Sequence, residues 1–418
     1  MRPDNMNKIF DLRKYFMNNF VFFASFFYLV LSAIKMRDYL TQGRFWAEEG
    51  TFFYSGIVNR NAFDAIFFTF NGHLEIVTNI IVYISTFVDL RYAPLVTTYL
   101  SLAVQFIPIY IMIRYRDALS LSRSNSILMV IISAGLPQAS EVWANSINLH
   151  FHFSLLVALI AAISLVKGPP KWVSRILLGI SGLSGIPSNF LIPVFAFLAL
   201  KTKEKERWIQ LSILSFTAFF QIVLLSSNDL RTGPREYFST PLAFWLAPVA
   251  QSVISPLFGF NIGDQLSVIL RDVLSLQPGP FLFSLMFSTP LIYLAVIAFK
   301  EKTSPISIII LSAFLILFMS IFLAIGNKLM LISAASGGRY FYASNMLLSI
   351  AILVSIRKYN IFTAIAILCL IISSSYNVKH YIGGPSWRSN FEISENPKDA
   401  TYKIWPNGWS MKIQNNEK

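Results

Sequence analysis

Charged side chains are scarce in this sequence. Together they make up only 13% of the 418 residues, whereas hydrophobic residues make up 55%. A soluble globular chain carries about 25% charged residues, so this composition excludes that class. The charges that are present give a net charge of +13, without any motif typical of DNA-binding or RNA-binding proteins. We attribute the basic excess to cytoplasmic loops and anionic lipid, and we expect no nucleic-acid partner.

Cysteine and histidine, which build disulfides and many metal sites, are also rare. The single cysteine, Cys369, excludes an intrachain disulfide. Of the four histidines, His150 and His152 point to different sides of a helix and lack cysteine partners, which argues against zinc. We expect no metal and no other cofactor. Repeats, low-complexity tracts and linkers are absent too, which indicates one membrane domain, 1–376, followed by a tail, 377–418.

What the chain has in abundance is long apolar runs. Several approach the ~20 residues that a helix needs to cross a bilayer core, among them 19–36, 93–113 and 304–326. Helices are expected because backbone groups in lipid must be hydrogen-bonded within the segment itself. The sequence therefore predicts an all-α polytopic membrane protein. The first run follows a basic stretch, as in a signal peptide, but it lacks a small-residue cleavage pattern, so we interpret it as a retained span.

Basic clusters alternate with neutral or acidic loops. Four basic residues precede the first run and predict a cytoplasmic N-terminus. Further basic clusters, expected inside, lie at 114–123, 167–175, 201–207, 300–302 and 357–358. The loops expected outside are 37–91, 138–147, 227–280 and 327–339.

This alternation requires the short apolar segment 74–88 to lie at the outer interface or to re-enter the membrane without crossing it. The prediction is then about eleven transmembrane helices, with the ~20-residue criterion relaxed for 125–138, 173–186 and 187–200. The N-terminus is inside and the C-terminus outside, and external juxtamembrane or re-entrant helices accompany the spans.

The first predicted outer loop contains RFWAEEG, in which two adjacent carboxylates stand among aromatic residues. A carboxylate near a low-dielectric interface can have a raised pKa and act as a general base. We assign the catalytic role to this pair, with Glu48 favoured as the base and Glu49 as a partner of Arg44 or of a substrate hydroxyl. The candidate substrate-binding residues of this loop are Arg44, His73, Glu75 and Arg91.

Other predicted outer segments hold further polar candidates. An arginine between small residues, as at position 339, could hold a phosphate by a forked pair of hydrogen bonds. Two asparagines of the second loop are three residues apart and would share a helix face. Tryptophan rings of the tail could stack on sugars. These substrate-binding candidates are Glu141, Asn145, Asn148, Arg339, Tyr340, Trp387, Trp405 and Trp409.

Each candidate also has a structural interpretation. The adjacent carboxylates could be a charged helix N-terminus favoured by the macrodipole. Arg339 could be an anchor at the membrane interface, and Arg91 a headgroup contact. His73 could serve structure alone, and the two asparagines could form interhelical hydrogen bonds. The tryptophans could fix the tail to the membrane surface.

The pattern resembles the GT-C class of integral membrane glycosyltransferases, which place an acidic residue in the first external loop and an acidic or polar cluster in the next. It also resembles a bacterial branch of multi-span proteins. That branch carries an Arg-Phe-Trp-Ala-Glu-(Asp/Glu)-Gly stretch, a Gly-x-x-His-like position, a Pro…Glu-Val…Asn…Asn segment, a Gly-x-Arg-Tyr-Phe turn and a Trp-Pro-x-Gly-Trp ending. Here the matching positions are 44–50, 72–73, 137–148, 338–341 and 404–409. In length and layout the chain is similar to phage-type, serotype-converting O-antigen glucosyltransferases, which depend on a first periplasmic loop and a C-terminal periplasmic tail.

The resemblance implies transfer of a hexose, with glucose expected, from a polyprenyl-phosphate-hexose donor to an extracytoplasmic glycan such as O-antigen. The reaction would be a single displacement with a carboxylate base, in the bacterial inner membrane, at a site facing the periplasm. Membrane lipid, a small flippase and a cytoplasm-facing polyprenyl-phosphate glucosyltransferase are the other implied partners. Oligosaccharyltransferase-like members of the class use an Asp-x-Glu-type metal pair in the second loop. Glu141 has no such partner, so the spacing does not support a divalent metal.

Two other functions are alternatives. An O-antigen polymerase or ligase would also have many spans, together with a long basic external loop, but 227–280 is charge-balanced and the carboxylates come early. A transporter of lipid-linked sugars should carry charges inside its spans and often has inverted repeats. The predicted spans are almost free of charge, so transport ranks third.

Overall fold

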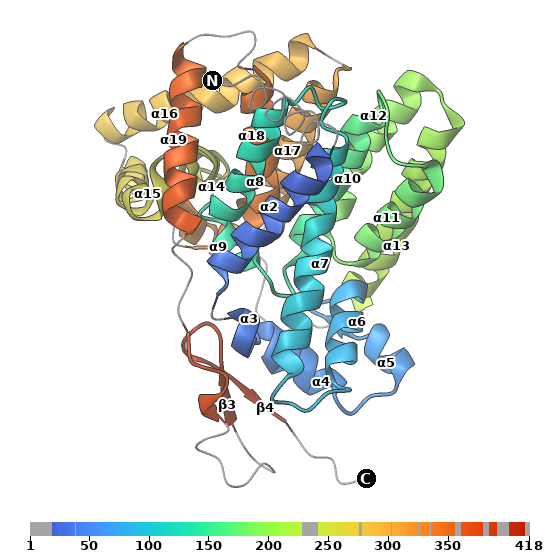
Figure 1. The fold of residues 1–418 in the computed structure, drawn as a ribbon. Helices are drawn as coiled ribbons and strands as arrows, with labels where there is room; N and C mark the ends of the chain where they lie inside the picture. The colour runs from blue at the N-terminus through green and yellow to red at the C-terminus, as the bar shows by residue number, and fades with distance from the viewer. Residues whose placement is uncertain are drawn as a thin grey trace, which may run out of the picture.

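The chain folds almost entirely into helices, accompanied by two short β-hairpins in the part that the structure describes (Figure 1). This structure is a computed structural model. It describes residues 19–37, 39–227, 241–275, 278–301, 303–324, 327–333, 336–355, 361–378, 384–390 and 401–413.

The elements follow one another in chain order, and their labels are those of Figure 1. Up to residue 227 the helices are α2 (Phe20–Lys35), α3 (Tyr39–Gln42), the π-helical turn η1 (Glu49–Tyr54), α4 (Ser55–Ile57), α5 (Ala62–Ile66), α6 (Ile76–Ser85), α7 (Ala93–Arg114), α8 (Arg123–Gly135), α9 (Ala139–Val142), α10 (Leu149–Ile163), α11 (Lys171–Leu183), η2 (Pro187–Leu191), α12 (Ile192–Thr202) and α13 (Lys205–Ser227). Later in the chain they are α14 (Ala243–Pro248), η3 (Val249–Ile254), α15 (Ser255–Arg271), η4 (Asp272–Ser275), α16 (Pro278–Lys300), α17 (Pro305–Leu323), η5 (Lys328–Ile332), η6 (Gly338–Phe341), α18 (Tyr342–Ser355) and α19 (Ile361–Val378). The strands are β1 (Thr69–Phe70), β2 (His73–Leu74), β3 (Thr401–Ile404) and β4 (Trp409–Lys412).

The centre of the helical body is α10. Apart from His150, His152 and Ser154 its side chains are apolar, and they are buried along nearly the whole helix. A helix of this kind needs neighbours on all sides, and α10 packs against α7, α11, α17 and α18. Its first turn faces the end of the molecule where α3 to α6 lie, so residues just before and after Leu149 come close to the first predicted outer loop (Figure 1).

Among the residues that the structure describes, five helices are long and apolar enough to cross a membrane: Ala93–Arg114, Lys205–Ser226, Ala243–Arg271, Pro278–Lys300 and Pro305–Leu323. Four shorter apolar helices accompany them in the described part of the chain: Phe20–Lys35, Ile76–Ser85, Leu149–Ile163 and Pro187–Thr202. The prediction of an all-α membrane protein is confirmed at this level. The expected total of about eleven spans is not reached by this criterion of length.

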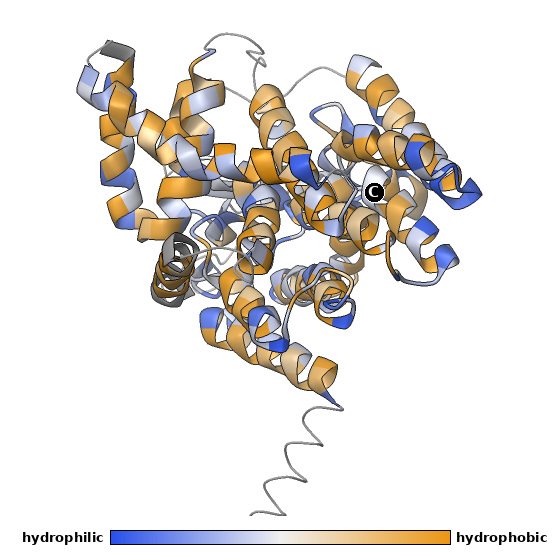
Figure 2. Cartoon of the chain, turned by 90° about the horizontal axis from the view of Figure 1, so that it is seen from above, coloured by the Kyte–Doolittle hydropathy of each residue, from blue (hydrophilic) through white to orange (hydrophobic). Residues whose placement is uncertain are grey.

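Large apolar side chains cover the outside of several long helices. Phe216 and Phe219 of α13 and Leu282 and Phe299 of α16 are each well over half exposed. Figure 2 shows apolar residues along most helices of the body, with hydrophilic residues mainly at helix ends and in loops. Exposed apolar surface of this extent is typical of a protein that contacts lipid.

The segment 74–88 forms the ten-residue helix α6, whose length of about 15 Å covers only half of a bilayer core. This length fits an interfacial or re-entrant helix.

Within the predicted large outer loop 227–280, residues 243–271 instead form a continuous helical run, which Gly259 kinks with a φ of 78°. Proline and glycine suggest a loop here, but Pro248 lies at a π-helical turn and Pro256 in a helical first turn, where each is tolerated.

The tail returns to the first outer loop. Strands β3 and β4 pair antiparallel, with Tyr402 opposite Met411 and Ile404 opposite Trp409. The hairpin packs against η1, and Trp46 forms a β-bridge with Trp405. In Figure 1 this hairpin lies at the same end of the molecule as α3 to α6. The two segments predicted to be external are therefore together at one end.

Candidate functional site

The RFWAEEG stretch is held in a sharp turn. Ala47 has a φ of 40°, a left-handed conformation that non-glycine residues seldom adopt. The tail stabilises this turn, because the Ala47 N–H donates to the Trp405 carbonyl and the Trp405 N–H donates to the Phe45 carbonyl (3.0 Å). The π-helical turn η1 begins two residues later, at Glu49. As a result, two carboxylates that are adjacent in sequence enter different environments.

Glu49 is fully buried and joins the first outer loop to the second. Its Oε1 accepts hydrogen bonds from the backbone N–H (2.8 Å) and the hydroxyl (2.6 Å) of Ser146, and its Oε2 accepts one from the Trp46 N–H (3.0 Å). Burial raises the pKa of Glu49, while the hydrogen bonds from Ser146 and Trp46 and the charge of Arg44 oppose that shift. Its oxygen atoms thus face backbone donors, which is the arrangement of a structural carboxylate.

Arg44 is enclosed by aromatic rings. Its guanidinium carbon lies 4.5 Å from the ring centre of Trp46, 4.8 Å from that of Tyr39 and 5.2 Å from that of Trp405. One guanidinium nitrogen donates to the Trp143 carbonyl (2.8 Å). Burial lowers the pKa of Arg44 to about 9, against the opposing effects of Tyr39 and Glu49. This arginine is part of the core between first loop, second loop and tail.

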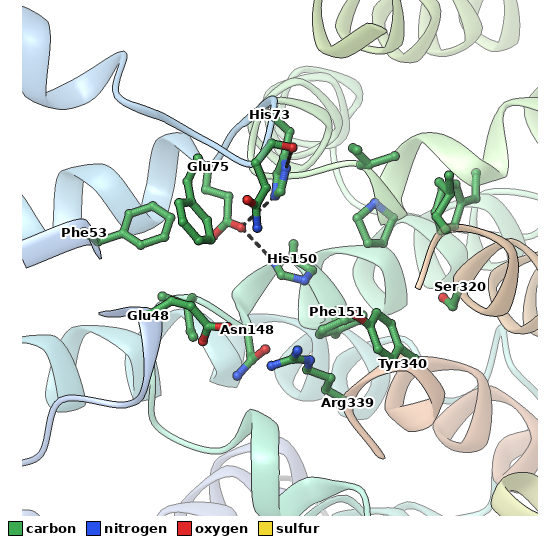
Figure 3. Close-up of a pocket in the computed structure, with 17 residues that line it drawn as sticks. Glu48, Phe53, His73, Glu75, Asn148, His150, Phe151, Ser320, Arg339 and Tyr340 are labelled. Carbon is green, nitrogen blue, oxygen red and sulfur yellow. Dashed lines mark hydrogen bonds and ion pairs between the residues drawn. The ribbon is translucent and has the colours of Figure 1, made fainter. Parts of the chain in front are cut away.

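Glu48 faces the other way, into a cavity of about 120 Å³. Its Oε2 is buried and has no hydrogen-bond partner among the described residues. Phenylalanine, isoleucine, proline and leucine side chains form the apolar part of the cavity. Its polar lining consists of Glu48, Asn71, His73, Glu75, Asn148, His150, Ser320, Arg339 and Tyr340 (Figure 3).

Arg339 reaches this cavity from η6, between α17 and α18. Glu141 fixes the turn, since the Gly338 and Arg339 N–H groups donate to its two carboxylate oxygens (3.3 and 3.4 Å). Gly337, with a φ of 64°, packs against Leu331 so closely that a Cβ would lie 2.5 Å from its Cδ2, which explains the glycine. In Figure 3 the guanidinium of Arg339 points toward Asn148 and Glu48.

The guanidinium of Arg339 keeps its positive charge in the cavity. Burial by itself lowers the pKa of this guanidinium, but Tyr340 and the carboxylates of Glu48 and Glu141 outweigh burial and raise the pKa above its ordinary value. The guanidinium carbon also lies 5.4 Å from the Tyr340 ring centre. A permanent cation thus lines the same cavity as a carboxylate with an oxygen that has no partner among the described residues.

The second predicted loop divides its polar residues between support and lining. Asn145 donates to the Glu141 carbonyl (2.8 Å), and its Oδ1 accepts from the side chain (2.9 Å) and backbone (3.1 Å) of Asn148. Asn148 also donates to the Glu141 carbonyl (2.9 Å) and lines the cavity, whereas Asn145 does not. The three-residue spacing does bring the two asparagines together, in a turn that precedes α10.

A second polar cluster, which we call the histidine wall, comprises His73, Glu75 and His150. Its first member is delivered by the β1–β2 hairpin, whose two-residue Asn71-Gly72 turn has φ values of 49° and 75°, as an Asn-Gly hairpin turn requires. The Glu75 Oε1 lies 3.0 Å from His73 Nε2 and 3.5 Å from His150 Nδ1 (Figure 3).

Further contacts hold Glu75 and the hairpin in place. Thr78 donates to the Glu75 Oε2 (3.0 Å), and Gln221 of α13 bonds both backbone groups of Leu74 (2.9 Å each). Burial by itself raises the pKa of Glu75, but His150 and His73 outweigh it and lower the pKa to about 2. In the described part of the chain, no group of three or more histidine, cysteine or acidic side chains is placed to hold a metal ion.

The tail tryptophans lie away from the cavity. Trp387 donates to the Arg91 carbonyl (3.1 Å) and packs edge-on against Phe45, with ring centres 5.4 Å apart. Trp405 is buried between Tyr39 and Arg44, and Trp409 is half-buried on β4. The Arg91 side chain is exposed. These rings form a second core between the first loop and the tail.

The structure therefore divides the predicted site residues into two groups. Those that line the cavity are Glu48, His73, Glu75, Asn148, Arg339 and Tyr340. Those that do not line it are Arg44, Glu49, Arg91, Glu141, Asn145, Trp387, Trp405 and Trp409.

Three polar residues of the cavity are not among the predicted site residues: Asn71, His150 and Ser320. The Asn-Gly dipeptide between apolar residues was an available signal for the hairpin turn. His150 had no comparable signal, because it approaches Glu75 only through the packing of distant segments. That packing is close, since a Cβ at Gly185 would lie 2.6 Å from the His150 Cβ. No family model, curated protein or solved structure matches the chain.

Proposed function

We propose that this protein is a GT-C-like glycosyltransferase of the bacterial inner membrane. In this proposal it transfers a hexose, expected to be glucose, from a polyprenyl-phosphate-hexose donor to an extracytoplasmic glycan such as O-antigen. The observation that carries the proposal is the cavity in which Glu48, with an unpartnered oxygen, and the cation Arg339 face one space.

The chemistry assigns one role to each of these side chains. The Glu48 carboxylate takes the proton of an acceptor hydroxyl as the hydroxyl oxygen attacks the anomeric carbon. The bond from that carbon to the phosphate oxygen breaks, and its electron pair leaves with the lipid phosphate. Arg339 stabilises the negative charge that develops on that phosphate. A single displacement of this kind inverts the anomeric configuration.

The surroundings of the cavity suit a substrate with a lipid part. Phe190, Ile186 and Leu323 line the cavity on its apolar side and belong to η2, the loop before it and α17. Helix α17 qualifies as a membrane span by length and composition. An apolar wall continuous with such a helix can receive the first isoprene units, while Arg339 holds the phosphate.

A transfer assay tests this function. Purified protein in lipid nanodiscs would receive radiolabelled polyprenyl-phosphate glucose, with and without O-antigen acceptor. We expect label on the glycan only when acceptor is present, and loss of labelling in a Glu48→Gln variant. Elongation of the glycan by whole repeats would instead indicate a polymerase, and movement of donor across the bilayer without transfer would indicate a transporter.

The proposal also includes the predicted orientation, with about eleven spans when the ~20-residue criterion is relaxed for short helices, the N-terminus inside and the C-terminus outside. A reporter that is active only outside the cytoplasm should give signal when fused after Lys418 and none when fused at Lys203. The reverse pattern would place the basic loops outside and contradict this orientation.

A further inference from the structure

In the histidine wall, His73 is held by contacts from both of its ring nitrogens. His73 Nε2 lies 3.0 Å from the Glu75 carboxylate, and His73 Nδ1 lies 3.3 Å from the Asn71 carbonyl. Both partners are hydrogen-bond acceptors, and together they hold the ring in one orientation.

The Glu75 carboxylate makes the histidine wall unlike the Arg339 side of the cavity. It lies within 3.5 Å of both imidazole rings and repels a phosphate, so an anionic group is better placed at Arg339. His150 directs Nδ1 to Glu75 at 3.5 Å, which leaves Nε2 as its ring atom for a ligand. A neutral polar group is the partner that such a wall favours.

Asn71 adds an acceptor that needs a donor. The residue is 95% buried, lines the cavity and has an Oδ1 without a hydrogen-bond partner among the described residues. A buried acceptor without a donor is destabilising, so such atoms in a native protein call for an explanation. Phe53 and Phe70 also line the cavity and offer apolar faces. Hydroxyl groups on an apolar ring, as in a pyranose, match both features.

We propose that Asn71 and His150, held by the His73–Glu75 pair, bind non-reacting hydroxyls of the donor hexose and so determine which sugar is accepted. Asn71 Oδ1 accepts a hydrogen bond from one hydroxyl, and His150 Nε2 contacts another. This inference rests on the proposed function and deepens it, because it separates a sugar-reading side of the cavity from the phosphate-binding side at Arg339.

The test pairs changes in the protein with changes in the sugar. Binding of a short-chain polyprenyl-phosphate glucose and of its four monodeoxy analogues (2-, 3-, 4- and 6-deoxy) would be measured on the full chain in nanodiscs. We expect at least one analogue to bind the parent protein about 10- to 100-fold more weakly, the scale of a lost hydrogen bond to a buried group.

In Asn71→Gly, which tolerates the positive φ of 49°, that penalty should fall below about threefold, because glucose binding weakens while binding of the analogue does not. His150→Phe should remove the penalty of a different hydroxyl in the same way. Arg339→Lys is the matched control, since it should weaken all five ligands and keep every penalty.

The outcomes separate the two proposals. If the parent protein binds none of these ligands, the proposed function fails and this inference fails with it. If the parent transfers glucose but every deoxy penalty persists in both Asn71→Gly and His150→Phe, the function stands and the sugar-reading role is overturned. Size-exclusion profiles and thermal unfolding of each variant would establish that it is folded.

Discussion

The Glu48–Glu49 dipeptide separates two regions that differ in how their buried polar groups are hydrogen-bonded. On the Glu49 side, the core between first loop and tail surrounds Arg44 with three rings and gives the carboxylate backbone donors. On the Glu48 side, the cavity leaves acceptor atoms of Glu48 and Asn71 without partners among the described residues. The first region has the properties of a structure that is complete by itself. The second has a property that is typical of a binding site, because two of its buried acceptors are left for a donor from outside the described residues.

The largest expected effect concerns the core between first loop and tail. Trp405→Ala removes a buried ring that covers Arg44 and Tyr39, and such truncations cost about 3–5 kcal/mol. We expect a strongly lowered unfolding temperature in detergent. Trp409→Ala, at a half-buried ring of the same hairpin, should cost clearly less. Equal losses in the two variants would mean that the tail is not specifically anchored by Trp405.

Acid should weaken the cavity side through Glu75. Its pKa is lowered to about 2 from 4.5, so the stabilisation that its ionised form provides is complete above about pH 4.5 and is lost as the pH falls toward 2. The shift corresponds to about 3 kcal/mol over the whole window. Unfolding temperatures measured from pH 6 to pH 3 should fall for the parent protein and change less for Glu75→Gln. Parallel curves would contradict the assignment.

Glu48→Gln should affect turnover alone. The amide keeps the shape of the side chain but cannot take a proton, so the transfer rate should fall by roughly 10²-fold or more, or about 2.7 kcal/mol of activation free energy. Donor binding and the unfolding temperature should stay close to those of the parent. A large loss of stability would instead place Glu48 with the structural residues.

Glu49→Gln should show the reverse pattern with a smaller magnitude. Both carboxylate oxygens face backbone N–H groups, of Ser146 and of Trp46, and the amide nitrogen of glutamine would point a donor at one of them. The expected cost is about 1–3 kcal/mol of stability, with turnover of the folded protein nearly unchanged. If both amides transfer sugar at the parent rate, the base must be sought at Glu75, which lines the cavity, or at Glu141, which does not.

Apolar runs and short motifs in the sequence predicted more of this molecule than span counting by helix length did. Apolar runs correctly indicated helices and a membrane protein, and RFWAEEG together with Arg339 pointed to residues that do share a cavity. The large outer loop at 227–280 could not be recognised as helical at 243–271, because a π-helical turn and the Gly259 kink interrupt the helical period there. Helix lengths also limit span counting, since α8 and α11 have only 13 residues each.

Contacts between distant parts of the chain were beyond sequence reasoning. The sequence around Glu48 does not show that its side chain faces a cavity while that of Glu49 bonds to Ser146. The directions of the two side chains depend on the backbone at Ala47 and on a partner strand about 360 residues later. The tail tryptophans were interpreted as sugar-binding because their contacts with distant residues are also not visible in the sequence. Their rings suit a sugar and a core equally well, and only the fold places Trp387 and Trp405 against Phe45 and Tyr39.

The pairing of Trp405 with residues 45–47 also sets an order of events during biosynthesis. The turn that carries Glu48 emerges early from the ribosome, but its partner strand is made some 360 residues later, about 20–70 s at the usual rate of translation. Throughout that interval the two ends of the turn lack the strand that closes them. A growing chain therefore carries residues 45–47 without the partner that closes their turn, and the turn is completed only when the tail has been made and has reached the first loop.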